Sequence, residues 1–87
     1  MTKQGVVMGL DLKKNTIIIS EETFVWDTNT KFFNEYASPI TVDKIKVKNW
    51  VYIEGVAKTG KPTAIQKIYL LPKYIPHEEK DKYPFMK

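Results

Sequence analysis

The sequence predicts a small all-β domain, a five-stranded OB-like barrel with a short helical turn between strands three and four and an irregular C-terminal tail. Apolar, β-branched segments recur along most of the chain, and short polar or glycine-containing turns separate them. No segment has the 3.6-residue period of a helix of useful length. The single helical turn falls where OB-folds place a helix or loop that plugs the barrel. The 87 residues suffice for one domain.

The first half of the chain predicts three strands joined by short turns. The first strand covers residues 6–10, in which Gly9 indicates a bulge or a sharp bend. The second covers residues 16–20, which are β-branched except for the last. The third covers residues 23–27, and residues 31–33 extend it beyond a turn rich in Asp, Asn and Thr.

A loop and one helical turn precede the fourth strand. Residues 34–41 contain a Ser-Pro pair and show no period, so they predict a loop. Residues 41–45 predict a single helical turn with Thr41 as its N-cap. Asn49 precedes the fourth strand, and we expect it to form a left-handed turn there because Asn adopts that conformation more readily than most residues.

The last two strands form a predicted hairpin. Residues 50–57 alternate between two faces, residues 58–62 form the connection, and residues 63–71 form the last strand. Apolar positions in the last strand lie three residues apart, although positions on one face of a strand are separated by two. This break in parity predicts a bulge near Gln66 and Lys67.

A tail follows the predicted barrel, so we divide the chain into a barrel of residues 1–71 and a tail of residues 72–87. Three prolines and three aromatic residues punctuate the tail: Pro72, Pro76, Pro84, Tyr74, Tyr83 and Phe85. The sequence leaves open whether these aromatic rings pack on the barrel or the tail is mobile.

The composition excludes several kinds of site and favours one cellular compartment. The chain has no cysteine, which excludes disulfides and thiolate metal sites and favours a reducing compartment. The first residues lack the apolar region of a signal peptide, and no apolar run approaches the roughly 20 residues that span a bilayer. We therefore expect a cytoplasmic protein without a membrane partner.

The net charge of +4 is distributed unevenly. Residues 44–73 form a basic block in which Glu54 is the one acid, which is typical of a surface that meets nucleic acid or an acidic protein. All 14 basic residues are lysine. The absence of arginine, the residue suited to bidentate phosphate and base contacts, disfavours sequence-specific reading of nucleic acid.

One face of the predicted hairpin is the main candidate for ligand binding. Parity directs Val51 and Ile53 into the barrel, so neighbouring aromatic rings point outward. The candidate face comprises three aromatic residues and three lysines: Trp50, Tyr52, Tyr69, Lys48, Lys58 and Lys67. Rings interleaved with lysines are typical of platforms that stack single-stranded nucleic acid. The same rings would equally suit burial under the tail or contact with a second copy.

OB-folds commonly bind ligands on strands two and three, which gives an alternative face. In this chain that face would use Phe24, Trp26 and Phe32.

Four segments together resemble small bacterial OB-like barrels. They are Gly5-Val6-Val7, residues 16–19, the segment from Phe24 to Phe32, and the run from Val51 to Gly55. The resemblance covers residues 5–71 and implies the fold rather than an activity.

The tail gives a second resemblance, to the periplasmic haem chaperone of cytochrome c maturation, another OB-type barrel. His77 followed by Tyr83-Pro84 is similar to the His, Tyr and Pro of that family's tail, although the interval here is six residues rather than four. The resemblance implies His77 and Tyr83 as haem or metal ligands.

No catalytic constellation is recognisable. The chain has no Cys nucleophile, no Ser-His-Asp set with a plausible nucleophile elbow and no phosphate-binding glycine loop. We therefore predict a non-enzymatic binding or protein-interaction module with no cofactor, whose ligand the sequence does not identify. A protein partner and a second copy of the chain are both open. Single-stranded nucleic-acid binding, and haem or metal carriage by the tail, remain as alternatives.

Overall fold

Strands form almost all of the regular structure. The computed structural model describes residues 1–86. The strands are β1 (Thr2–Asp11), β2 (Thr16–Ile19), β3 (Glu22–Val25), β4 (Lys31–Phe33), β5 (Trp50–Lys58) and β6 (Lys61–Leu71). Three 3-10 turns complete the fold: η1 (Val42–Lys44), η2 (His77–Lys82) and η3 (Pro84–Met86). None of the helical segments in residues 1–86 is long and apolar enough to cross a membrane.

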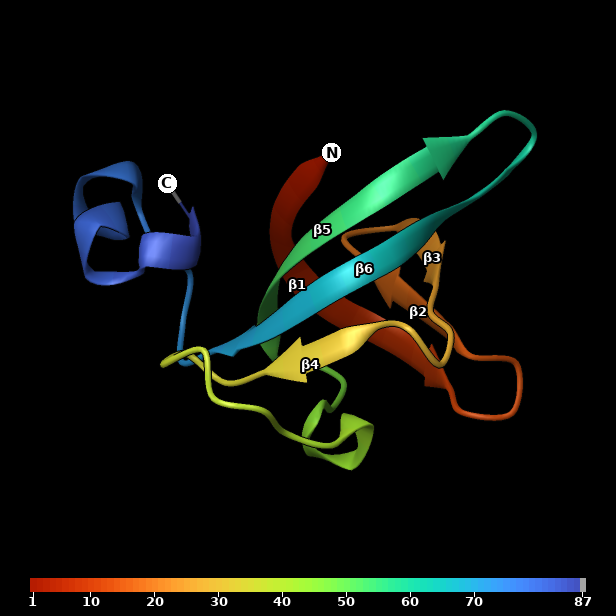
Figure 1. Cartoon of the computed structure of the whole chain (residues 1–87), viewed down its shortest axis with the longest axis horizontal. Coiled ribbons are helices and arrows are strands. Elements are labelled where there is room, and N and C mark those ends of the chain that lie inside the picture. The colour runs from red at the N-terminus through yellow and green to blue at the C-terminus, as the bar shows by residue number, and fades with distance from the viewer. Residues whose placement is uncertain (87) are drawn as a thin grey trace.

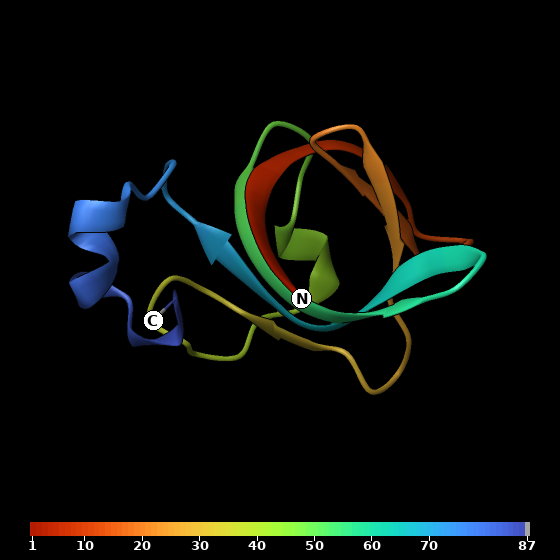
Figure 2. The same cartoon turned by 90° about the horizontal axis from the view of Figure 1, so that it is seen from above.

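The strands close into a barrel. They follow the order β3-β2-β1-β5-β6-β4, and a further pairing of β3 with β6 closes the ring, which Figure 2 shows from above. Both β3 and β4 pair with β6 in parallel, so they act as two halves of one bent strand (Figure 1). Five structural strands therefore surround the core, and the predicted all-β OB-like barrel is confirmed.

Two predicted irregularities bend the long strands. Val7 pairs with Ile19 but Gly9 pairs with Ile18, which places a bulge in β1. In the β5–β6 pair the register shifts between Glu54 and Gly55. Gln66 is the extra residue in β6, as the break in parity predicted.

The segment between β4 and β5 differs from the prediction in its turn chemistry. The helical turn forms as η1, but the Thr41 hydroxyl does not cap the backbone and instead donates to the Asp43 carboxylate. Lys48, rather than Asn49, adopts the left-handed conformation with φ of 79°. The Asn49 side chain accepts a hydrogen bond from the Lys46 backbone N–H at 2.8 Å, which stabilises the turn. Asn49 therefore contributes a side-chain acceptor there.

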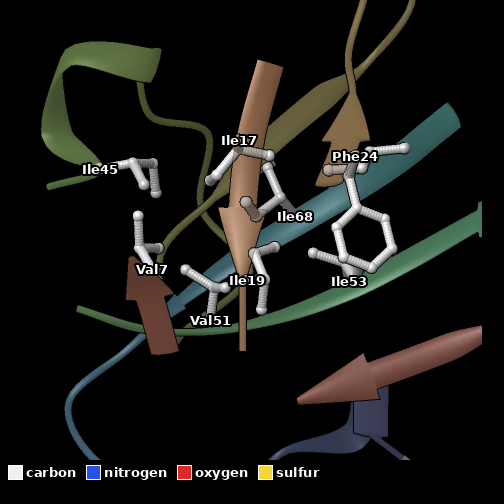
Figure 3. Close-up of a cluster of buried hydrophobic side chains, with 9 residues drawn as sticks. Val7, Ile17, Ile19, Phe24, Ile45, Val51, Ile53 and Ile68 are labelled. Atoms are coloured by element: carbon white, nitrogen blue, oxygen red, sulfur yellow. The ribbon is translucent and has the colours of Figure 1, made fainter. Parts of the chain in front are cut away.

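Aliphatic side chains and one aromatic ring fill the barrel. The core comprises Val7, Ile17, Ile19, Phe24, Ile45, Val51, Ile53, Ile65 and Ile68, most of which Figure 3 shows pointing toward one another. Ile45 follows η1 and closes the barrel at that point. Because side chains occupy the interior, as is usual in small barrels, we look for ligand sites on the outer surface.

The tail packs against the outside of β5 and β6, which answers the question left open by the sequence. Ile75 and Met86 of the tail form a second apolar cluster with three strand residues, Tyr52, Tyr69 and Leu71. Two hydrogen bonds join the Gln4 side chain to the Ile75 backbone. The tail is thus part of the folded unit, and it contains 3-10 turns instead of being wholly irregular.

Candidate functional site

The three aromatic residues of the candidate face point out of the barrel, as parity predicted, but the tail covers them. Tyr52 and Tyr69 are only 8% and 5% exposed. The Tyr69 ring lies between two others, with Phe33 stacked at 4.9 Å and Phe85 at 3.9 Å between ring centroids. Trp50 is half-buried and meets the edge of Tyr74 at 5.4 Å. We call this set of rings the covered aromatic face.

Burial also changes the pKa of one phenol on this face, that of Tyr69. The pKa of the Tyr69 phenol is raised from its ordinary value, first by burial and then by the nearby Glu54 carboxylate. A stacking platform for bases needs exposed ring faces, and Tyr69 has both faces occupied by protein. Of the alternatives that the sequence left open for these rings, the structure shows burial under the tail, and their contribution here is to packing.

The lysines of the candidate face do not form one group. Lys48 precedes the start of β5, whereas Lys58 ends that strand, about 30 Å further along at the usual rise of a strand. Lys58 and Lys67 both line a groove beside the β5–β6 hairpin, where Lys31 joins them. Lys31 was missed by sequence reasoning, because its position follows from the parallel pairing of Lys31 with Lys67.

This hairpin groove has a volume of about 520 Å³. Its lining residues come from the β3–β4 connection and from both hairpin strands: Asp27, Asn29, Lys31, Val56, Lys58, Ala64, Ile65, Gln66 and Lys67. Aliphatic side chains supply part of the surface and lysines the charge.

The groove exists because the bent strand leaves β6 and then returns to it. β3 pairs with β6 up to Ala64, and β4 resumes the pairing at Lys67, so the bulge at Gln66 stays uncovered between them. The buried Thr30 hydroxyl holds the intervening turn: it donates to the Ile65 carbonyl at 2.7 Å and accepts from the Asp27 N–H at 3.0 Å. The groove wall is therefore tied to β6.

Lysines outnumber acids around the hairpin groove, where Glu54 lies opposite Lys67 in the sheet. Lys31, Lys58 and Lys67 are exposed and make no ion pair with any residue in 1–86. Asp27 is the one acid in the lining, and its carboxylate accepts a hydrogen bond from the Asn29 N–H. Lys61, which pairs with Lys58 across the hairpin, adds a further charge nearby.

The alternative face on strands two and three is also unavailable to a stacking ligand. Phe24 is fully buried in the barrel core, so it is not accessible to a ligand on this face. Trp26 and Phe32 are partly buried, meet edge to face at 6.2 Å and pack against that core. These rings anchor the bent strand.

The two tail residues proposed as haem or metal ligands lie in different environments. His77 begins η2 and is exposed, whereas Tyr83 packs edge to face on Phe85 at 6.0 Å. Within residues 1–86, no three His, Cys, Asp or Glu side chains converge as a metal site would require.

The fold is similar to solved structures of two small proteins. The fimbrial biogenesis protein PilY2 of Pseudomonas aeruginosa has a TM-score of 0.64 at 20% identity, over 80% of this chain and 84% of that chain. A Cu(II)-bound tryptophan variant of CusF from Escherichia coli has a TM-score of 0.62 at 22% identity, over 80% of this chain and 89% of that chain. The Ag(I) form of CusF has a TM-score of 0.59 at 22% identity, over 80% and 95%.

These similarities show the shared barrel fold. No protein-family model matches the sequence, and no curated protein matches it. The likeness to the haem chaperone stays a prediction.

Proposed function

We propose that this chain is a non-enzymatic binding module that holds an acidic segment of a protein partner in the hairpin groove. The observation that carries the proposal is the convergence of Lys31, Lys58 and Lys67 around one groove, where none of the three forms an ion pair within residues 1–86. Lysine ammonium groups attract carboxylates as point charges. The exposed aliphatic side chain of Val56 would meet an apolar side chain between those carboxylates.

Two observations favour an acidic peptide over single-stranded nucleic acid. The groove lining contains no aromatic ring on which a base could stack, and the rings of the covered aromatic face are packed under the tail. The chain also has no arginine for bidentate phosphate contacts. The same lysines would still attract a phosphate backbone, so nucleic acid is an outcome that the test must separate.

The test measures binding of a fluorescein-labelled oligoglutamate peptide, with aliphatic residues between the glutamates, by fluorescence anisotropy. We expect the triple variant K31Q/K58Q/K67Q to lose most of the affinity, while the control K13Q/K14Q/K44Q, which carries the same charge change on exposed lysines elsewhere, keeps it. An equal loss of affinity in the two variants would mean that the peptide binds by nonspecific charge attraction and not in the groove. Tighter binding of an oligothymidylate at about 50 mM salt would favour nucleic acid instead.

Metal carriage is the second candidate, because two of the similar structures are metal-bound forms of CusF. Soft ions such as Ag(I) prefer thioether and imidazole ligands. Here Met1 and Met8 are about half exposed, at 48% and 54%, and His77 lies on the tail. Calorimetric titration with Ag(I) tests the candidate: saturable binding of one ion that M8L or H77A abolishes would support it, and no saturable heat would remove it.

The absence of an enzymatic activity and the cytoplasmic location are further parts of this proposal. Three features support a binding site on the outer surface: side chains fill the barrel interior, the Thr30 hydrogen bond to Ile65 fixes the groove wall, and lysines line the groove.

A further inference from the structure

An exposed aromatic ring stands on a rigid turn at the end of the molecule that carries the tail. Tyr36, at 78% exposed, follows β4 in a turn organised by the Asn34 side chain. The Asn34 carboxamide oxygen accepts from the Tyr36 N–H at 2.8 Å and from the Ser38 N–H at 3.0 Å. Backbone bonds from Asn34 to Ser38 and from Ala37 to Asn34 close the turn. Tyr36 is therefore held out to solvent on a backbone that has little freedom to lose on binding.

A pocket of about 300 Å³ adjoins this ring. The turn contributes Glu35, Tyr36 and Ala37, and the tail contributes Lys82, Pro84 and Phe85. Its surface is largely apolar, with one acid on the turn side and one base on the tail side. Phe85 is fixed from behind by its stack on Tyr69 at 3.9 Å. The projecting ring and the receptive pocket therefore lie on the same face of the molecule.

We propose that this face binds a second copy of the chain across a twofold axis, with Tyr36 of each copy seated in the pocket of the other. A twofold contact is isologous, so one face must carry both the inserting group and its receptor, as this one does. The charges are complementary under the same operation, because Glu35 of each copy would meet Lys82 of the other. Within residues 1–86, Lys82 makes one long ion pair, to Glu79 at 3.9 Å.

Several features favour a second copy over another protein as the occupant. The face carries one acid and one base, so two copies meet without the repulsion that a net charge of +4 would otherwise bring. Tyrosine is enriched among residues that dominate interface energetics, and a ring buries about 150–250 Å². Two rings make a small interface, so we expect a weak dimer with a dissociation constant of about 10–1000 µM.

The inference is independent of the acidic-peptide proposal. The β5–β6 hairpin and the tail lie at opposite ends of the molecule in both Figure 1 and Figure 2. The hairpin groove and the Tyr36 pocket share no lining residue. Loss of either activity would therefore leave the other intact.

Sedimentation equilibrium of the full chain over about 0.01–1 mM tests the proposal. We expect the wild-type mass to rise toward that of a dimer, Y36A to weaken the dimer by about thirtyfold or more, and Y36F to keep it. Because Tyr36 is exposed, Y36A should fold normally, which circular dichroism checks. K61E, on the hairpin, is the control for K82E, because it makes the same change of charge away from the Tyr36 face. It should keep the dimer.

A charge exchange makes the test specific for the twofold geometry. E35K alone and K82E alone should each be monomeric, since each pairs like charges across the axis. An equimolar mixture should restore a dimer, because the lysine introduced by E35K would then meet the glutamate introduced by K82E, while the native pair forms at the symmetric position. A wild-type monomer at about 1 mM, a Y36A dimer as tight as wild type, or a mixture that stays monomeric would each overturn the proposal.

Discussion

The side chain of Gln4 is paired with the backbone of Ile75 as one peptide group pairs with another in a sheet. Its amide nitrogen donates to the Ile75 carbonyl at 3.0 Å, and its carbonyl oxygen accepts from the Ile75 N–H at 2.6 Å. Ile75 is fully buried. The first strand therefore supplies the hydrogen bonds that the tail needs in order to enter an apolar environment.

Removing this pair should release the tail. Q4A leaves the buried Ile75 N–H and carbonyl without partners, and we expect a loss of about 1–3 kcal/mol in the free energy of unfolding by urea. Hydrogen exchange at the Ile75 amide should accelerate as well. Q66A, at the exposed bulge of β6, is the control and should change neither. Unchanged exchange at Ile75 in Q4A would contradict a clamping role for Gln4.

The stack of Phe85 on Tyr69 should matter more than the contact of Tyr74 with Trp50. Phe85 lies nearly parallel to Tyr69, with an angle of 5° between the rings, and is half-buried, whereas Tyr74 is 53% exposed. We expect F85A to cost about 1–3 kcal/mol and to expose Tyr69 to solvent in ultraviolet difference spectra. Y74A should cost less than F85A. If the two variants were equally stable, the Phe33–Tyr69–Phe85 stack would not be what holds the tail.

Stability should fall at alkaline pH in a way that depends on Tyr69. Its pKa is raised in the folded chain by burial and by Glu54, so the folded state retains the phenol proton when the unfolded state has begun to lose it. The stabilisation is fully present below the unfolded pKa of about 10 and is lost as pH rises through the higher folded pKa. Urea midpoints at about pH 9 and pH 11 should therefore differ more for the wild type than for Y69F. The same pH dependence in both proteins would exclude this contribution.

Two glycines of the hairpin should tolerate substitution to different degrees. A Cβ on Gly55 would lie 2.6 Å from the Ala64 carbonyl oxygen, a backbone atom that moves only if β5 and β6 separate. We expect G55A to cost more than about 2 kcal/mol. Gly60 has φ of 72° and open space around it, so G60N, which tolerates the left-handed conformation, should cost less than about 1 kcal/mol. Thermal denaturation distinguishes the two, and a G55A variant as stable as G60N would mean that the close approach is not rigid.

The barrel could be predicted because its signals are local. Gly9 in an apolar run indicated the bend of β1, and the spacing of Ile65 and Ile68 indicated the bulge at Gln66, since each follows from the alternation of side chains along a single strand. The burial of Phe24 could not be predicted in this way, because the face that β3 buries depends on its partners, β2 and β6.

The sites could be predicted only in part, because they depend on long-range pairing. Lys31 joins Lys67 through the register of two strands that are distant in sequence, and no local pattern encodes that register. The cover over Tyr52 and Tyr69 depends on where the tail turns back. Its anchor, Gln4, is a polar residue near the N-terminus with no sequence signal for that role.

The separation of the hairpin groove from the Tyr36 face has a consequence for multivalent binding. The molecule is 34 Å along its longest axis, and the β5–β6 hairpin and the tail lie toward its opposite ends. Two copies joined through Tyr36 would carry two hairpin grooves in one assembly, since the groove and the Tyr36 pocket share no lining residue. Such an assembly could bridge two acidic segments on a repetitive partner, so that avidity rather than the affinity of one groove would set the strength of attachment.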